Sequence, residues 1–434
     1  MRLFKDQERI IKEIMLNLDK NNLIISPSGS GKTYMISQIT KNLIMQDKKV
    51  IIIVPTNVVQ EQTYNLLKLF GVYAPVETSL KFISMKKLKD VDFIIVDEAH
   101  HSEANIHKDL FNKFPKAKRI GFTATPVRLD GKNLGNSFDN VIQGLTVKEL
   151  ISLNRLSPFK YYAPNLSSQS IPEFFQSSSL TVDNNSFYIQ NKQNNSYNTE
   201  YKGVMFGDVI NTYKKIAKNK QAILFAQSIE QSKEFALAFK RENIKCDHID
   251  GYMSFEERKK ILDNFRKGKI QVICNFNLIS EGFDMNDCEV VILARRTLSL
   301  ALYLQQVFRA LRYKKDKEAI ILDHANNIHY HNQIDMERYW DLNIENKKKD
   351  NSNNYPSNVK KPNLTYIFDE SIELEDISNS KNPKFEKEVK EALEKEGFES
   401  FKALVQIQTT YNIISTSDKS WAYTMATHYN KLIV

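Results

Sequence analysis

Residues 26–33 read Ser-Pro-Ser-Gly-Ser-Gly-Lys-Thr, and this stretch lies between two segments of different periodicity. Residues 23–25 are Leu-Ile-Ile, which predicts a buried strand, whereas residues 31–45 repeat apolar side chains at helical spacing. Small residues in the turn let backbone amides converge on phosphate oxygens, and the dipole of the following helix favours negative charge there. The order strand, glycine-rich loop, helix therefore predicts a phosphate site on an α/β fold.

The side chains of this loop have separate expected tasks. Lys32 is expected to reach the β- and γ-phosphates of a nucleoside triphosphate, and Thr33 to hold Mg²⁺. Position 26 is a serine where the usual pattern starts with glycine. The alternative is a glycine- and serine-rich turn that binds no nucleotide, and the flanking strand and helix argue against it. The remaining phosphate contacts are expected from Ser28, Gly29, Ser30 and Gly31.

An acidic pair follows a second apolar run. Phe-Ile-Ile-Val at 93–96 predicts another buried strand, and Asp-Glu-Ala-His at 97–100 comes directly after it. Asp97 is placed to meet, through water, the metal ion held by Thr33, and Glu98 to orient or deprotonate an attacking water. Adjacent Asp and Glu favour hydrolysis over kinase chemistry, and a pair of exposed acids at a helix start is the alternative. The two segments together predict hydrolysis of a nucleoside triphosphate.

Length and composition set the broad class. At 434 residues the chain is long enough for two or three domains, and 41% apolar with 26% charged residues is typical of a globular protein. Its uninterrupted apolar stretches stay below the roughly 20 residues of a membrane span, and its first residues lack the apolar core of a secretion signal. We therefore expect a cytoplasmic protein that has no membrane partner.

Charge and cysteine content narrow the partners further. A net charge of +9 and a pI near 9.0 favour a polyanionic partner, because Lys and Arg release counterions condensed on phosphates. Cys246, Cys274 and Cys288 are too far apart for a Cys-x-x-Cys metal site, and an odd number argues against a disulfide framework. We expect all three to be reduced thiols in the core.

Strand and helix patterns alternate in two successive blocks. This alternation predicts an α/β fold with two doubly wound parallel-sheet lobes in tandem, of which only the first has a glycine-rich loop. We assign lobe 1 to residues 1–165 and lobe 2 to 201–330, with the polar stretch 166–200 as a linker or insertion. Residues 331–434 are expected to form a small, mainly helical C-terminal extension with a solvated connector at 345–363. The expected strands are 23–25, 50–54, 93–96 and 120–122 in lobe 1, and 222–226, 272–274, 290–293 and 319–322 in lobe 2.

One predicted helix of lobe 2, at 298–312, carries an informative polar pattern. An apolar stripe runs along it, while Gln305, Arg309 and Arg312 occupy a neighbouring face at steps of four and three. Two arginines on one face of a docked helix are able to point across a cleft at a γ-phosphate, where positive charge stabilises the transition state. The alternative is a solvated basic face.

Taken in order, these segments resemble superfamily 2 helicases of the DEAD/DEAH type, in the XPB-like and phage-encoded branch, over about residues 1–330. Gln7 is similar to the glutamine of the Q motif, and the two segments described first are similar to motifs I and II. The other similar segments are 54–56 (motif Ia), 123–126 (motif III), 224–226 (motif IV), 280–284 (motif V) and 305–312 (motif VI).

The resemblance implies two RecA-like lobes that close on ATP and Mg²⁺, with a nucleic acid, DNA rather than RNA, lying across both. Under it, Gln7 reads the adenine base, Gly282 and Asp284 join the nucleotide site, and the arginine fingers are Arg309 and Arg312. Contact with nucleic acid and coupling to the nucleotide site come from Pro55, Thr56, His100, Thr123 and Thr125. The family further implies a monomeric motor of bacterial or phage origin, with a nuclease, a methyltransferase or a replication or repair protein as candidate partners.

One position departs from the family pattern. The usual glycine of motif VI is Phe308 here, and a phenyl ring facing the cleft would weaken the docking of the arginines. We expect the ring to join the apolar stripe instead and activity to be retained. Two alternatives stay open beside a helicase or translocase: a nucleotide-gated DNA-binding module with weak ATPase, and the motor subunit of a restriction or defence complex.

The last part of the chain carries a short aromatic motif. Residues 419–423, Lys-Ser-Trp-Ala-Tyr, are similar to the ending of phage-type helicases. This motif predicts either an aromatic anchor of a small core or a stacking surface for nucleic acid.

Overall fold

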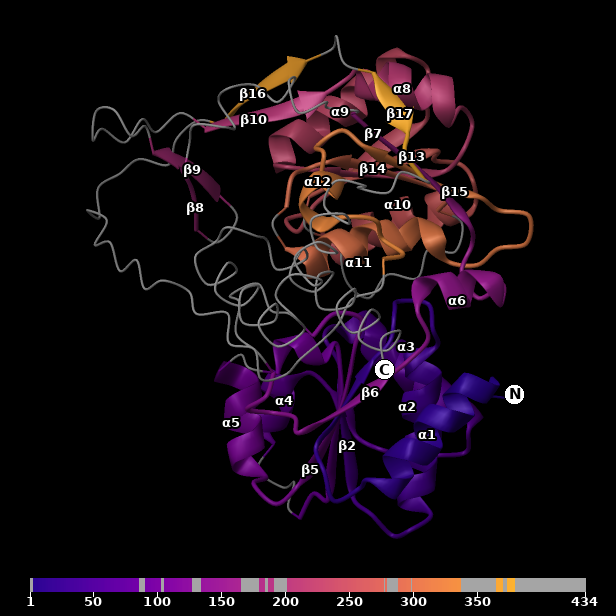
Figure 1. Ribbon diagram of the computed structural model, residues 1–434, viewed down its shortest axis with the longest axis vertical. Helices are drawn as coiled ribbons and strands as arrows, with labels where there is room; N and C mark the ends of the chain where they lie inside the picture. Colours follow the sequence, from indigo (N-terminus) through magenta and orange to yellow (C-terminus); the bar gives the residue numbers. More distant parts are fainter. Residues whose placement is uncertain are drawn as a thin grey trace, which may run out of the picture.

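The computed structural model describes residues 3–85, 90–102, 105–126, 134–164, 179–183, 186–190, 201–276, 278, 288–297, 299–336, 364–369 and 373–378. These residues form two α/β lobes that follow one another along the long axis of the molecule (Figure 1). Among them, no helix combines the length and the apolar character that crossing a bilayer requires.

The first lobe is built around a parallel six-stranded sheet with the order β3-β2-β4-β5-β1-β6. Its central strands are buried on both faces, which explains their nearly continuous runs of Ile and Val. The strands are β1 (Asn22–Ile25), β2 (Val50–Ile53), β3 (Val76–Glu77), β4 (Phe93–Asp97), β5 (Lys118–Thr123) and β6 (Asn140–Gln143). The helices are α1 (Lys5–Leu16), α2 (Lys32–Ile44), α3 (Asn57–Leu69), α4 (Ser79–Ser84), the 3₁₀ turn η1 (Ala99–His101) and α5 (Asn105–Lys113).

Two hydrophobic layers enclose this sheet. Strand residues such as Ile24 and Ile52 pack with Met35 and other residues of α1, α2 and α3. On the opposite face, strand residues such as Ile51 pack with Leu110 and other residues of α4 and α5. The two sets of helices lie on opposite sides of the sheet in Figure 1, which is the doubly wound arrangement.

The second lobe has a seven-stranded sheet with the order β12-β13-β11-β14-β15-β7-β17, parallel except for β17. One hydrophobic layer joins the sheet to α8 and α9, and the other joins it to α6, α10 and α11. The strands are β7 (Phe159–Pro164), β11 (Ala222–Ala226), β12 (Cys246–Ile249), β13 (Val272–Asn275), β14 (Val290–Ala294), β15 (Ala319–Asp323) and β17 (Leu374–Asp376). The helices are α6 (Val147–Ser152), α8 (Val209–Ile216), α9 (Ile229–Arg241), α10 (Phe255–Arg266), α11 (Leu300–Leu311) and α12 (Ile328–His331).

The predicted pair of doubly wound sheets is confirmed. Every strand expected from the apolar runs is present, with ends that differ by no more than two residues from the predicted ones. The three cysteines are free and buried, as expected, and the Sγ atoms of Cys246 and Cys274 lie 3.6 Å apart.

The end of the first lobe was predicted too late in the chain. β7 falls within the range 1–165 assigned to lobe 1, but it pairs with β15 in the second sheet. Tyr161 and Ala163 of β7 and Leu150 of α6 are buried in the core of lobe 2. The last strand of lobe 1 is therefore β6, which ends at Gln143, because the following apolar side chains bury against the other sheet.

The polar stretch and the C-terminal extension contain strands that were not predicted. β8 (Ser179–Asp183) and β9 (Ser186–Gln190) form an antiparallel hairpin within 166–200. In the extension, β16 (Leu364–Asp369) pairs in parallel with β10 (Tyr201–Phe206), and β17 adds an antiparallel edge beside β7. The connector 345–363 and the motif at 419–423 lie outside the described residues, as does most of the extension expected to be helical.

The close approach at Gly121 in β5 gives a test of the packing of lobe 1. A Cβ atom there would lie 2.5 Å from Cζ of Phe138 and 2.8 Å from Cβ of Ala99, and both neighbours are buried. Gly121→Ala should therefore destabilise the protein by about 1–3 kcal/mol through overpacking, measured by urea denaturation. Gly251→Ala is the matched control, since no atom lies within 4 Å of its added Cβ; equal stability of both variants would contradict the prediction.

Candidate active site

The phosphate loop connects β1 to α2 and depends on two glycines. Gly29 and Gly31 have φ values of 91° and 86°, in the left-handed region that favours glycine. A Cβ atom on Gly31 would lie 2.5 Å from Nε2 of Gln7, and one on Gly29 would lie 2.8 Å from Cδ2 of Leu156. The loop is thus held closely between the start of α1 and a segment that leads into lobe 2.

The serine at position 26 has a structural partner. Ser26 Oγ donates to Ser30 Oγ at 2.8 Å, and both side chains are buried. A Cβ atom on Gly144 would lie 2.7 Å from Ser26 Oγ, so the missing side chain at 144 leaves room for the serine. The departure from glycine at position 26 therefore adds a hydrogen bond across the loop and leaves the turn intact.

Gln7 is buried beside the loop and has hydrogen-bonding capacity left for a ligand. Its Oε1 accepts from the backbone N–H of Phe4 at 3.1 Å, and its Nε2 donates to the carbonyl oxygen of Ser30 at 3.0 Å. A primary amide has a second hydrogen and a second lone pair, and this donor and acceptor pair matches N7 and N6 of adenine. Reading of the base by Gln7 stays a prediction.

Lys32 and the acidic pair lie together at the carboxyl edge of the first sheet. Lys32 Nζ lies 3.4 Å from the carbonyl oxygen of Ser26 and 3.9 Å from Oε1 of Glu98, and its side chain is buried. Glu98 has a φ of 52°, which is uncommon for a residue with a side chain and is typical of functional sites. This backbone conformation directs its carboxylate toward Lys32 and His100.

The donor set fits the magnesium ion that the resemblance implies. Thr33 lies in the first turn of α2, which follows β1, and Asp97 ends β4. Strand β5 lies between β1 and β4, so the hydroxyl and the carboxylate come from the same edge of the sheet but not from adjacent strands. Mg²⁺ takes oxygen ligands and is usually bound by one or two carboxylates together with phosphate and water. Within the described part of the chain, no cluster of three His, Cys, Asp or Glu residues offers a metal site made of protein alone. A site completed by phosphate oxygens is the chemistry these residues support.

A buried chain of polar contacts leads from the acidic pair to the predicted coupling residues. His100 Nδ1 lies 3.3 Å from Oε2 of Glu98 and 3.2 Å from Oγ1 of Thr123. Thr123 Oγ1 donates to the carbonyl oxygen of Thr125 at 2.8 Å and accepts from its N–H at 3.1 Å. Because the Thr123 hydroxyl proton is used on Thr125, Nδ1 of His100 is the donor toward Thr123. The structure therefore brings His100, Thr123 and Thr125 together, and their coupling role stays a prediction.

Pro55 and Thr56 lie where β2 ends, at the same edge of the sheet. Thr56 is the N-cap of α3, and its Oγ1 accepts from the N–H of Val59 at 3.4 Å. Capping alone is a sufficient structural reason for a threonine at this position. Contact with a nucleic-acid backbone stays a prediction for both residues.

The predicted helix of lobe 2 is α11, and Phe308 lies on its core side. The ring is buried among the apolar residues of lobe 2, as expected for a member of the apolar stripe. Gln305 and Arg309 are also largely buried, whereas Arg312 is the C-cap residue and follows the last helical turn. The burial of Phe308 in this cluster argues against a binding module that is inactive because of this ring.

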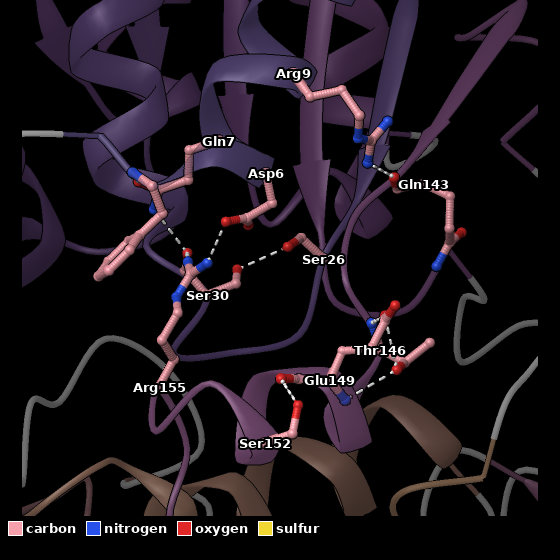
Figure 2. Close-up of polar contacts among 11 residues, drawn as sticks. Asp6, Gln7, Arg9, Ser26, Ser30, Gln143, Thr146, Glu149, Ser152 and Arg155 are labelled. Atoms are coloured by element: carbon pink, nitrogen blue, oxygen red, sulfur yellow. Dashed lines mark hydrogen bonds and ion pairs between the residues drawn. The ribbon is translucent and has the colours of Figure 1, made fainter.

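Sequence reasoning missed Arg155, which joins the site from the segment between the lobes (Figure 2). Arg155 Nη1 donates to Oδ1 of Asp6 at 2.6 Å, and its Nη2 donates to the carbonyl oxygen of Ser30. Its guanidinium carbon lies 4.3 Å from the ring centroid of Phe4. In the sequence Arg155 is a single arginine between Asn154 and Leu156, and it belongs to no recognisable motif that would mark it as part of the site.

Two predicted site residues, Gly282 and Asp284, lie outside the described residues. The other members of the predicted nucleotide site are placed in two groups. Those on lobe 1 adjoin the phosphate loop, and those on lobe 2 lie on or just after α11.

Three sequence families match this chain. The family described as "Type III restriction enzyme, res subunit" matches residues 1–81, "SWI2/SNF2 ATPase" matches 66–174, and "Helicase conserved C-terminal domain" matches 205–314. Together these ranges cover both lobes, from the Q-motif segment to the end of α11.

Individual proteins are also similar to the chain. A "51.5 kDa protein" of Lactococcus phage (isolate 7-9) is 38% identical over 323 residues, which cover 73% of this chain and 68% of the phage protein. The "DNA 3'-5' translocase XPB2" of Sulfurisphaera tokodaii is 23% identical over 355 residues, covering 70% of this chain and 77% of the translocase. Two further curated relatives are longer, and the chain spans 61% and 36% of their length.

A solved structure supports the fold. The ATP-dependent Type ISP restriction-modification enzyme LlaBIII bound to DNA superposes with a TM-score of 0.52 at 16% identity, covering 74% of this chain and 28% of the enzyme. At this level of identity the likeness concerns the arrangement of two RecA-like lobes.

The position of Phe308 predicts that restoring the usual glycine harms the protein. Phe308→Gly removes a buried ring, which costs about 3–5 kcal/mol, and places glycine inside a helix, which costs about 1 kcal/mol more. We expect a lower melting temperature and no gain in ATP turnover, measured by differential scanning calorimetry and a phosphate-release assay. Phe308→Leu, which keeps the position apolar, should lose less stability, and a faster Phe308→Gly enzyme would show that the ring obstructs the site.

Proposed function

The chain belongs to superfamily 2 of the ATP-dependent helicases, and on that premise we propose that DNA is the nucleic acid on which it works. The net charge of +9 favours a polyanion but does not separate DNA from RNA. The similarity to a protein named as a DNA 3′–5′ translocase supports DNA, and it supports movement in the 3′ to 5′ direction. A phage relative supports a role inside a bacterial cell during phage growth.

We assign the lobe 1 residues to nucleotide binding and water activation. Lys32 contacts the β- and γ-phosphates, Thr33 and Asp97 hold Mg²⁺, and bound Mg²⁺ neutralises phosphate charge. Glu98 accepts a proton from the attacking water as the new bond to the γ-phosphorus forms and the bond to the β,γ-bridging oxygen breaks. The proximity of Glu98 to Lys32 and to His100 supports this assignment.

The lobe 2 residues complete the site from the opposite side. Arg309 and Arg312 stabilise the charge that develops on the transferred phosphoryl group, and Gln305 on the same helix helps to orient the reacting groups. The observation that carries this proposal is the backbone bridge between Leu156 and Arg312, because Leu156 also contacts the phosphate loop at Gly29. Leu156 is therefore the residue that lies between the end of α11 and the phosphate loop.

Nucleic-acid contact is proposed for the carboxyl edge of the sheet in lobe 1. Pro55 and Thr56 follow β2 at this edge, and the contacts of His100, Thr123 and Thr125 connect the edge to Glu98. A change in the strand bound there would reach the water-activating carboxylate through the hydrogen bonds of Thr123 and the 3.3 Å contact between His100 Nδ1 and Oε2 of Glu98. We propose that this chain of contacts couples strand binding to hydrolysis in a monomeric motor.

The test is the rate of ATP hydrolysis with single-stranded DNA, duplex DNA, forked DNA or RNA added. We expect DNA to raise the rate more than RNA does, and Lys32→Ala to lower it by roughly 100-fold or more, because a charged contact to the transferred phosphoryl group is lost. Lys49→Ala is the matched control, since Lys49 is exposed at the amino edge of the sheet beside Asp90. A rate indifferent to every nucleic acid would refute the motor, and preferential stimulation by RNA would refute the substrate assignment.

A second candidate function is the motor subunit of a restriction or defence complex. The match of residues 1–81 to the res subunit of type III restriction enzymes favours it. In that case a nuclease or methyltransferase subunit should copurify with the tagged chain from its native host. A chain recovered alone, with full DNA-stimulated ATPase, would favour an independent helicase.

A further inference from the structure

Residues 155–157 contact both lobes within three consecutive positions, and we call them the 155–157 bridge. They follow α6, where Asn154 turns the chain with a φ of 53°. The N–H groups of Arg155 and Leu156 both donate to the carbonyl oxygen of Leu150, at 2.8 and 3.2 Å. The bridge is therefore fixed at its start to a helix whose apolar side packs in lobe 2.

On the side of lobe 1, the bridge is held by the side chain of Arg155. Its side chain is only 6% exposed, and its guanidinium contacts the carboxylate of Asp6, the carbonyl oxygen of Ser30 and the ring of Phe4. A buried guanidinium needs such partners, because an unpaired buried charge is costly. Figure 2 shows Arg155 reaching from below toward Asp6 and Ser30. These contacts tie the bridge to the phosphate loop and to the start of α1.

On the side of lobe 2, the bridge is held by the end of α11. Ser157 N–H donates to the carbonyl oxygen of Leu311 at 2.9 Å, and Ser157 Oγ donates to that of Arg312 at 3.2 Å. The last carbonyl groups of a helix lack partners within the helix, so such external donors fix where its final turn lies. Arg309 is in that final turn, and Arg312 follows it.

We propose that Arg155 is a positioning residue, which sets the end of α11 against the phosphate loop so that Arg309 and Arg312 meet the γ-phosphate. This inference rests on the proposed function of those two arginines. Arg155 acts through the two residues that follow it. Leu156 pairs with Arg312 along the backbone, and Ser157 donates hydrogen bonds to the carbonyl oxygens of Leu311 and Arg312. Small misplacements of catalytic groups are expensive, and about 1 Å costs up to roughly 100-fold in rate.

The expected signature separates catalysis from binding. The binding of ATP in its ground state depends mainly on the residues of lobe 1. The arginines of lobe 2 act in the transition state, when charge develops on the phosphoryl group. Arg155→Lys keeps the positive charge but loses the planar fork that contacts Asp6 and Ser30 together. We therefore expect kcat with DNA present to fall about 10- to 100-fold while KM for ATP changes by about 3-fold or less.

The experiment measures kcat and KM on the full chain, together with the affinity for ADP plus aluminium fluoride, which imitates the transferred phosphoryl group. Affinity for this complex should fall in parallel with kcat in Arg155→Lys. Arg9→Lys is the matched control, because Arg9 is an exposed arginine of α1 that contacts Glu13 and the carbonyl oxygen of Gln143, all within lobe 1. It should leave all three quantities unchanged.

Unchanged kcat in Arg155→Lys would overturn the inference, and so would a rise in KM alone, since Arg155 would then serve ATP binding only. If Arg155→Lys does not fold, Asp6→Asn carries the test by the same criteria, since it removes the charge partner and keeps an acceptor. The wild-type chain distinguishes a failure of the proposed function from a failure of the role of Arg155. No DNA-stimulated hydrolysis by the wild type refutes the proposed function, whereas normal hydrolysis by the wild type and by Arg155→Lys refutes only the role of Arg155.

Discussion

The carbonyl oxygen of Ser30 is the point on which the arrangement of the site depends. It accepts from Nε2 of Gln7 at the start of the chain and from Nη2 of Arg155 in the segment between the lobes. The left-handed turns at Gly29 and Gly31 expose this oxygen to both donors. A single peptide group of the phosphate loop therefore unites α1, the loop itself and the path into lobe 2.

The conformation of Glu98 shows how lobe 1 combines two demands. A carboxylate that activates water must lie close to the phosphates, and it must also respond to the strand-binding edge. The left-handed backbone at Glu98 serves both, because one oxygen faces Lys32 and the other faces His100. Such a conformation costs roughly 1–3 kcal/mol and persists only where surrounding contacts hold it in place. The N–H of Glu98 donates to Oδ1 of Asp97 at 3.0 Å, and its carboxylate contacts Lys32 and His100.

Much of the fold and part of the site follow from the sequence, for physical reasons that particular residues illustrate. Buried parallel strands have continuous apolar runs, so β1, β4 and β11 were predictable from the order of residues along the sequence. The closeness of Lys32 to Glu98 was predictable because phosphate and metal chemistry restricts which residues follow those strands, and their roles stay predictions. β7 was assigned to the wrong lobe, since its residues suit either sheet and only packing decides between them. Arg155 was not predictable, because its role arises from contacts with residues distant in the chain.

The place of β7 in the second sheet decides where a stable fragment of lobe 2 can begin. β7 lies between β15 and β17 in the second sheet, so its removal would leave the peptide groups of β15 without their neighbour. An exposed row of such groups is a template for pairing with other molecules and for aggregation. A fragment of lobe 2 that starts at residue 166 would lack β7 and leave β15 as an unpaired edge strand. A fragment that starts at residue 144 would keep β7 paired with β15.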